Sequence, residues 1–133
     1  MTMTEAANRL ALAAAEAASD KKARDIVLID VSDQLPLTDV FVIATADNER
    51  QVQAVVDAVE ERLLREHVKP VGIEGKGNAR WVLLDFREIV VHVQHAEERD
   101  VYDLVRLWRD CPIVHFGGDG AAQTAPSTDA TGT

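Results

Sequence analysis

Two continuous runs of apolar, largely β-branched residues constrain the fold most: DIVLIDV over residues 25–31 and DVFVIAT over residues 39–45. A strand with one face in water alternates apolar and polar side chains, whereas an unbroken apolar run indicates a strand buried on both faces. Pro36 lies in the turn-forming stretch 32–38 and separates the two strands. We therefore expect a sheet that other elements cover.

Three segments have the spacing of helices. Residues 3–19 are rich in alanine, and residues 47–66 carry the clearest apolar stripe, with Asp47 as the expected N-cap. The stripe consists of Val52, Val55, Val56, Val59 and Leu63. Residues 97–110 form the third predicted helix. Its apolar face consists of Val101, Leu104, Val105 and Trp108.

Three further strands are predicted at residues 69–75, 79–86 and 87–94, and the short break between the last two favours an antiparallel hairpin. The order of elements predicts an α/β (α+β) fold: a single domain over residues 1–116 with a mixed five-stranded sheet flanked by helices. Residues 117–133 contain no large apolar side chain, so we expect a disordered C-terminal tail.

The stretch GIEGKGNARW, residues 72–81, contains three glycines and a lysine, as phosphate-binding loops do. Such a loop also needs a helix N-terminus directly behind it. Here the residues from Ala79 onward are typical of a strand, and no Ser or Thr follows Lys76 to hold a magnesium ion. The stretch is therefore predicted to connect two adjacent strands.

Titratable side chains do not form a recognisable catalytic set. Asp30, Asp39 and Asp85 lie near strand ends, but none belongs to the Asp-x-Asp pair that metal-dependent phosphoryl transfer would use. His92 and His95 are three residues apart and tend toward opposite faces, so His92 is expected to be a packing residue. We expect a binding module, not an enzyme, with no cofactor and no metal site.

The chain is acidic, with 14 Lys and Arg against 23 Asp and Glu and a net charge of −9. It repels a polyanion on average, so no direct DNA contact is expected, and a charged partner would be a basic protein. No apolar run is long enough for a bilayer, no signal-peptide pattern is present, and the single Cys111 excludes an intramolecular disulfide. These features indicate a cytoplasmic protein without a membrane partner.

Both tryptophans and the single tyrosine lie in the second half of the chain. Trp81 begins a strand directly after the glycine stretch, where it fits either the edge of the core or an interface anchor. Trp108 lies on the apolar stripe of the last predicted helix, which favours the core. Tyr102 is one residue away from that stripe.

The string GIEGKGNARWVLLDFREIVVHVQHAEERDVYDLVRLW, together with DIVLIDVS and LTDVFVIATADNERQVQAVVDAVEE upstream, resembles the ribosomal silencing factor family, also called Iojap-like proteins. The resemblance covers about residues 5–110. It is carried by short blocks: Asp30-Val31, Asp39, Phe41-Val42-Ile43, Arg50-Gln51-Val52, Glu74-Gly75, Trp81 to Asp85, Val90-Val91-His92, Arg99, Tyr102, Leu104, Leu107 and Trp108. No single block is specific, but together they are.

The resemblance implies a nucleotidyltransferase-like fold without the catalytic carboxylates. It also implies a protein that binds the large ribosomal subunit through ribosomal protein L-fourteen and sterically blocks joining of the small subunit. Translation would thereby be repressed, especially under nutrient limitation, and the isolated protein would form a homodimer. The alternatives are a large-subunit assembly factor and, less favoured, a minimal nucleotidyltransferase-like enzyme that uses Asp30, Asp39 or Asp85 with magnesium.

The same resemblance implies a contact surface made of the glycine stretch, the Trp81 strand and the last helix. The residues expected to bind the ribosomal protein are Glu74, Lys76, Trp81, Leu83, Asp85, Arg99 and Tyr102. Trp81 would be the aromatic anchor, with Glu74 and Lys76 at the polar rim. The chain departs from the family in the last hairpin, residues 85–88, where a glycine is common and Arg87 would resist positive φ. It also departs at Gln94, where an aromatic residue is common.

Overall fold

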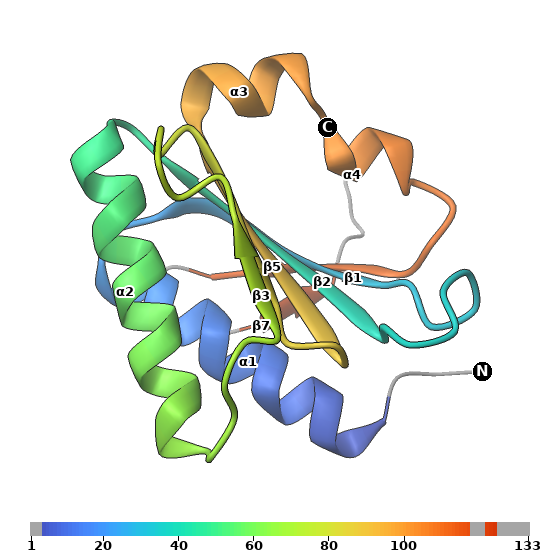
Figure 1. Ribbon diagram of the computed structural model, residues 1–133. Helices are drawn as coiled ribbons and strands as arrows, with labels where there is room; N and C mark the ends of the chain where they lie inside the picture. The colour runs from blue at the N-terminus through green and yellow to red at the C-terminus, as the bar shows by residue number, and fades with distance from the viewer. Residues whose placement is uncertain (1–3, 118–121, 125–133) are drawn as a thin grey trace.

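The computed structural model describes residues 4–117 and 122–124. Helices α1 and α2 lie against one face of a twisted sheet, and two short helices, α3 and α4, lie against the opposite face (Figure 1). The helices are α1 (Glu5–Asp20), α2 (Glu49–Arg65), α3 (Ala96–Val101) and α4 (Leu104–Leu107). The strands are β1 (Arg24–Asp30), β2 (Val40–Ala46), β3 (Gly72–Glu74), β4 (Trp81–Asp85), β5 (Ile89–His95), β6 (Ile113–Phe116) and β7 (Ala122–Thr124).

The described strands form one mixed sheet of seven, in the order β3-β4-β5-β2-β1-β6-β7. Strands β2 and β5 are parallel at its centre, and every other neighbouring pair is antiparallel. The mixed sheet and the β4–β5 hairpin are confirmed. The predicted count of five strands is wrong, because β6 pairs with the free edge of β1 and β7 pairs with β6. Both added strands are too short to give a periodic signal.

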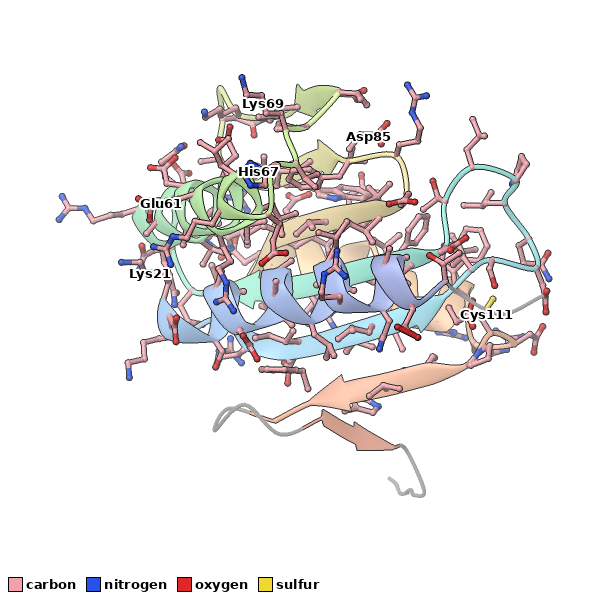
Figure 2. All side chains as sticks on the ribbon, turned by 90° about the horizontal axis from the view of Figure 1, so that it is seen from below. Lys21, Glu61, His67, Lys69, Asp85 and Cys111 are labelled. Carbon is pink, nitrogen blue, oxygen red and sulfur yellow. The ribbon has the colours of Figure 1, made fainter. Side chains whose placement is uncertain are left out.

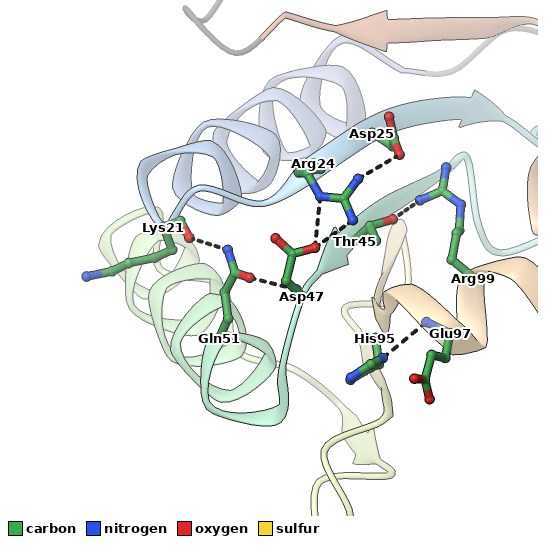
Figure 3. Close-up of polar contacts among 9 residues, drawn as sticks. All are labelled: Lys21, Arg24, Asp25, Thr45, Asp47, Gln51, His95, Glu97 and Arg99. Atoms are coloured by element: carbon green, nitrogen blue, oxygen red, sulfur yellow. Dashed lines mark hydrogen bonds and ion pairs between the residues drawn. The ribbon is translucent and has the colours of Figure 1, made fainter.

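The face covered by α1 and α2 contains most of the core. All five residues of the predicted α2 stripe are fully buried. In α1 the buried positions are mostly alanine, and small side chains let this helix lie close to the sheet and to α2. Asn48, not Asp47, caps α2 by accepting a hydrogen bond from the Gln51 backbone N–H, while Asp47 binds the Arg24 guanidinium at 2.6 Å (Figure 3).

The opposite face carries a smaller core and is only partly covered. Val27, Ile29, Val31 and Ile43 are buried there. Half-buried side chains of α4 and the segments beside it, including Leu104, Val105 and Trp108, pack over them. Among the described residues, no helix packs over the rest of this face, toward β4 and β3 (Figure 1).

The third predicted helix, residues 97–110, is wrong as a single element. It breaks at Tyr102, whose ψ of 81° is not helical, and resumes after Asp103. Asp103 accepts a hydrogen bond from the Arg106 backbone N–H and so begins a new helix. At this break the Tyr102 side chain is 49% exposed, so it does not extend the apolar stripe of the predicted helix.

The predicted disordered tail, residues 117–133, lies largely outside the described residues. Within it, residues 122–124 form β7, which pairs with β6.

The β4–β5 turn adopts positive φ at Arg87 (72°), despite the side chain there. The Arg87 N–H donates to the Asp85 side chain at 2.7 Å, and the Thr38 hydroxyl donates to the Arg87 carbonyl oxygen at 2.9 Å. These two hydrogen bonds hold a conformation that glycine would adopt without steric cost.

We predict that His67→Gly stabilises the fold by about 0.5–1 kcal/mol. His67 follows the end of α2, where it is exposed and has φ of 63° (Figure 2). The Val68 N–H reaches back to the Leu63 carbonyl oxygen in the pattern that favours glycine at this position. Urea unfolding measures the change. His67→Ala keeps a Cβ and should show no gain; a gain equal to that of glycine would contradict the explanation.

Candidate protein-binding face

The uncovered part of the sheet presents side chains from β4, β3 and β2. In β4, Val82 and Leu84 are buried on the α1–α2 side, so the alternate residues Trp81, Leu83 and Asp85 point to the opposite side, where they are half-buried. Glu74 of β3 pairs with Leu83 and points the same way. We call this surface the Trp81 face; it consists of Phe41, Glu74, Trp81, Leu83, Asp85 and Tyr102.

Five rings form a continuous row beneath and along this face. The Trp81 and Tyr102 ring centroids are 5.1 Å apart, and those of Trp81 and His92 are 6.1 Å apart. Phe41 then contacts His92 edge-on at 5.0 Å and Trp108 edge-on at 5.3 Å. Contacts at these distances fix ring orientations. Trp81 is therefore both part of a packed row and partly accessible, and Trp108 packs as predicted.

His92 is the buried centre of the row, with 6% of its surface exposed. Its Nδ1 accepts a hydrogen bond from the Trp81 indole N–H at 3.2 Å. Burial lowers the pKa of His92 to about 4, so the imidazole is neutral near pH 7. The packing role predicted for His92 is confirmed. Its hydrogen bond to Trp81 was not predicted from the sequence, because it depends on the pairing of β4 with β5.

Tyr102 and Arg99 are held by buried polar groups of the neighbouring strands. The Gln94 side-chain amide donates to the Tyr102 carbonyl oxygen at 3.3 Å. The Arg99 guanidinium reaches from α3 to the hydroxyl of the buried Thr45 in β2 (Figure 3). Desolvation lowers the pKa of Arg99 from its ordinary value. Arg99 thus anchors α3 to the sheet and does not belong to the exposed Trp81 face.

Lys76 is also separate from the Trp81 face. Its ammonium lies 3.6 Å from the Glu60 carboxylate of α2 and so is directed toward that helix. The structure brings together five of the seven predicted residues: Glu74, Trp81, Leu83, Asp85 and Tyr102.

Gly75 explains part of the glycine stretch. Its φ is +84°, and a Cβ placed on it would lie 2.1 Å from the Trp81 carbonyl oxygen. At Gly72 and Gly77 a Cβ would meet nothing within 4 Å. Gly75 therefore lets the connection pass against the start of β4, beside a shallow hollow lined by Glu74, Gly75, Trp81 and Leu83.

Sequence reasoning did not identify Arg80 as a residue that supports this face. Its guanidinium binds the carboxylates of Glu97 at 2.8 Å and Glu98 at 3.3 Å, joining the residue before β4 to α3. The hydrogen bond and charge of Arg80 lower the pKa of Glu97. The sequence gives little signal for this role, because no fixed spacing along the chain links Arg80 to the acidic residues Glu97 and Glu98.

The three aspartates considered for catalysis have local partners. Asp30 accepts from the Ser32 hydroxyl, Asp39 from the Thr4 backbone N–H, and Asp85 from the Arg87 backbone N–H. Across the residues that the structure describes, no three His, Cys, Asp or Glu side chains form a metal-binding group. Nor does this part of the chain contain a helix long and apolar enough to cross a membrane.

A family model described as "Ribosomal silencing factor during starvation" matches residues 4–132. The chain belongs to this family. It is 37% identical over 100 residues to the ribosomal silencing factor of Bacillus subtilis, covering 75% of this chain and 85% of that protein. It is 40% identical over 95 residues to the ribosomal silencing factor of Chromobacterium violaceum, covering 71% of this chain and 78% of that protein.

A solved structure shares the fold, and a more distant relative has a name linked to the large ribosomal subunit. A crystal structure of a Chromobacterium violaceum protein superposes with a TM-score of 0.74 at 37% identity, covering 77% of this chain and 85% of that chain. A mouse protein named "Mitochondrial assembly of ribosomal large subunit protein 1" is 34% identical over 93 residues, which are 66% of this chain and 40% of that protein.

We predict that Gly75→Ala destabilises the fold by at least about 2 kcal/mol. An alanine there combines positive φ with a clash against backbone that cannot rotate away. Thermal unfolding measures the loss. Gly77→Ala is the matched control and should stay within about 0.5 kcal/mol. Equal effects of the two substitutions would show that Gly75 is not needed for the close approach.

We predict that His92 makes the fold acid-sensitive. Because its pKa is about 4 when folded and about 6.5 when unfolded, the unfolded chain binds the extra proton between these values. Stability from this residue is complete above pH 6.5 and falls as pH drops, by about 3 kcal/mol at pH 4. Urea unfolding at pH 7 and pH 4 measures the free energy of unfolding. The loss between the two pH values should be smaller in His92→Leu than in the original chain by that amount. An unchanged dependence would contradict the prediction.

Proposed function

We propose that this chain binds the large ribosomal subunit through ribosomal protein L-fourteen, by way of the Trp81 face, and sterically blocks joining of the small subunit. Translation is then repressed, most strongly when nutrients are limiting. The protein acts by occupying a surface, in the cytoplasm, without catalysis. In isolation it forms a homodimer.

The observation that carries this proposal is the partly exposed aromatic surface on the part of the sheet that α3 and α4 leave uncovered. Trp81 and Leu83 are half-buried, and Tyr102 is 49% exposed. All three lie within residues 4–132, which the family model matches. Tryptophan and tyrosine are frequent anchors of protein interfaces. The aromatic row and the Trp81–His92 bond hold these rings in place before binding, which reduces the entropy lost on association.

Charge supports a basic protein partner. The Trp81 face itself carries the carboxylates of Glu74 and Asp85, which are exposed and half-buried, respectively. The whole chain has a net charge of −9. Such a surface accelerates encounter with a basic ribosomal protein and does so less as salt rises.

A second candidate function is assembly of the large subunit, and the mouse relative's name supports it. Both functions use large-subunit binding, but only silencing requires that small subunits be excluded from mature large subunits. The nucleotidyltransferase-like enzyme is the least supported alternative, because Asp30, Asp39 and Asp85 each bind local backbone or hydroxyl groups and are not paired with one another. A thermal shift with nucleotide and magnesium tests it directly.

The test of silencing combines co-sedimentation with light scattering. Purified protein should sediment with isolated large subunits and not with small subunits. It should also reduce the light-scattering rise when small subunits are added. Binding without inhibition of joining would favour assembly over silencing, and absence of binding to large subunits would defeat both.

We predict that Trp81→Ala weakens binding to large subunits at least tenfold, because it removes the central aromatic anchor. Leu64→Ala is the matched control: Leu64 is 52% exposed on α2, on the other side of the molecule, and its loss should leave affinity unchanged. Circular dichroism checks that both variants fold. If folded Trp81→Ala binds as tightly as the original chain, the Trp81 face is not the docking surface.

A further inference from the structure

His92 has a hydrogen-bonding pattern that fold stability does not explain. The indole N–H of Trp81 can only donate, so the His92 Nδ1 that receives it must be unprotonated. In a neutral imidazole the proton then lies on Nε2. That Nε2 is buried and has no hydrogen-bond partner among the described residues. The imidazole therefore satisfies one nitrogen and leaves the other without a partner.

An apolar side chain would suit the fold at this position at least as well. A buried polar group without a partner costs free energy, and apolar replacement of similar shape is often neutral or stabilising. The ring lies against Phe41 at 5.0 Å, and its neighbours across the sheet are Ile43 and Leu83. The feature that an apolar residue could not supply is the acceptor for the Trp81 indole.

We propose that His92 is a positioning residue, which orients the Trp81 indole for the ribosomal protein while remaining below the contact surface. This inference rests on the proposed function of the Trp81 face. Trp81 is only half-buried, and its contacts with Tyr102 and His92 are tilted, at 36° and 45° between ring planes. The hydrogen bond to Nδ1 selects one rotation of the indole, because the N–H is on one edge of the ring.

Two substitutions separate positioning from packing. His92→Leu fills the site without an acceptor. His92→Asn is the conservative variant, since its Oδ1 occupies nearly the place of the imidazole Nδ1 and can accept the indole N–H. We expect His92→Leu to melt at the same or a higher temperature than the original chain at pH 7. We also expect it to bind large subunits several-fold more weakly, and His92→Asn to restore most of the affinity.

The direct readout is the indole N–H itself. The chain has two tryptophans, so a ¹⁵N-labelled sample gives two indole resonances, and Trp81→Phe identifies which belongs to Trp81. In His92→Leu the Trp81 indole hydrogen should exchange with water at least tenfold faster, with the Trp108 resonance as internal control. In His92→Asn the slow exchange should return.

The outcomes distinguish this inference from the proposed function. Unchanged indole exchange in His92→Leu overturns positioning. So does full large-subunit affinity in His92→Leu when Trp81→Ala has lost affinity. If the original chain does not bind large subunits, the proposed function fails in the unsubstituted protein, and indole exchange alone then decides whether His92 orients Trp81.

Discussion

The parallel pairing of β2 with β5 is the constraint on which the rest of the structure depends. The two strands align over seven residue pairs, from Val40 with Ile89 to Ala46 with His95. Side chains on the two faces of each strand are buried. A shift of the pairing register by one residue would move every side chain of the shifted strand to the opposite face. This register places Val91 and Val93 against α1 and α2, and directs His92 and Gln94 to the opposite side. The support beneath Trp81 thus follows from the central strand pair.

Unequal cover of the two faces makes one of them available for binding. Helices α1 and α2 cover their face along its length, while α3 and α4 are short and cover only part of the other (Figure 1). Asp103 begins a second helix after Tyr102, so α3 and α4 are two separate short elements. The aromatic row continues from the covered core at Trp108 to the exposed ring of Tyr102. Core packing and the proposed binding surface are therefore one continuous structure.

Sequence patterns predicted the elements that are long and periodic, such as α2 with its buried stripe and the apolar strands β1 and β2. They did not predict β6, which is four residues long and pairs with the edge of β1. They also did not predict the helix break at Tyr102, where Asp103 caps a new helix within an apolar pattern typical of one continuous helix. For the candidate site, alternation along β4 and its pairing with β3 brought Trp81, Leu83 and Glu74 together. Lys76 and Arg99 are not grouped with them in the structure, because their long side chains reach partners on α2 and β2 that only the tertiary fold brings near.

Hydrogen–deuterium exchange of the chain, free and bound to large ribosomal subunits, tests most directly whether the Trp81 face is the docking surface. If the Trp81 face docks on the large subunit, binding slows exchange of backbone amides in residues 74–85 and 99–108. Exchange along the exposed side of α2, residues 57–66, should be unchanged. Protection of α2 with no change in residues 74–85 would show instead that the large subunit binds the opposite side of the molecule.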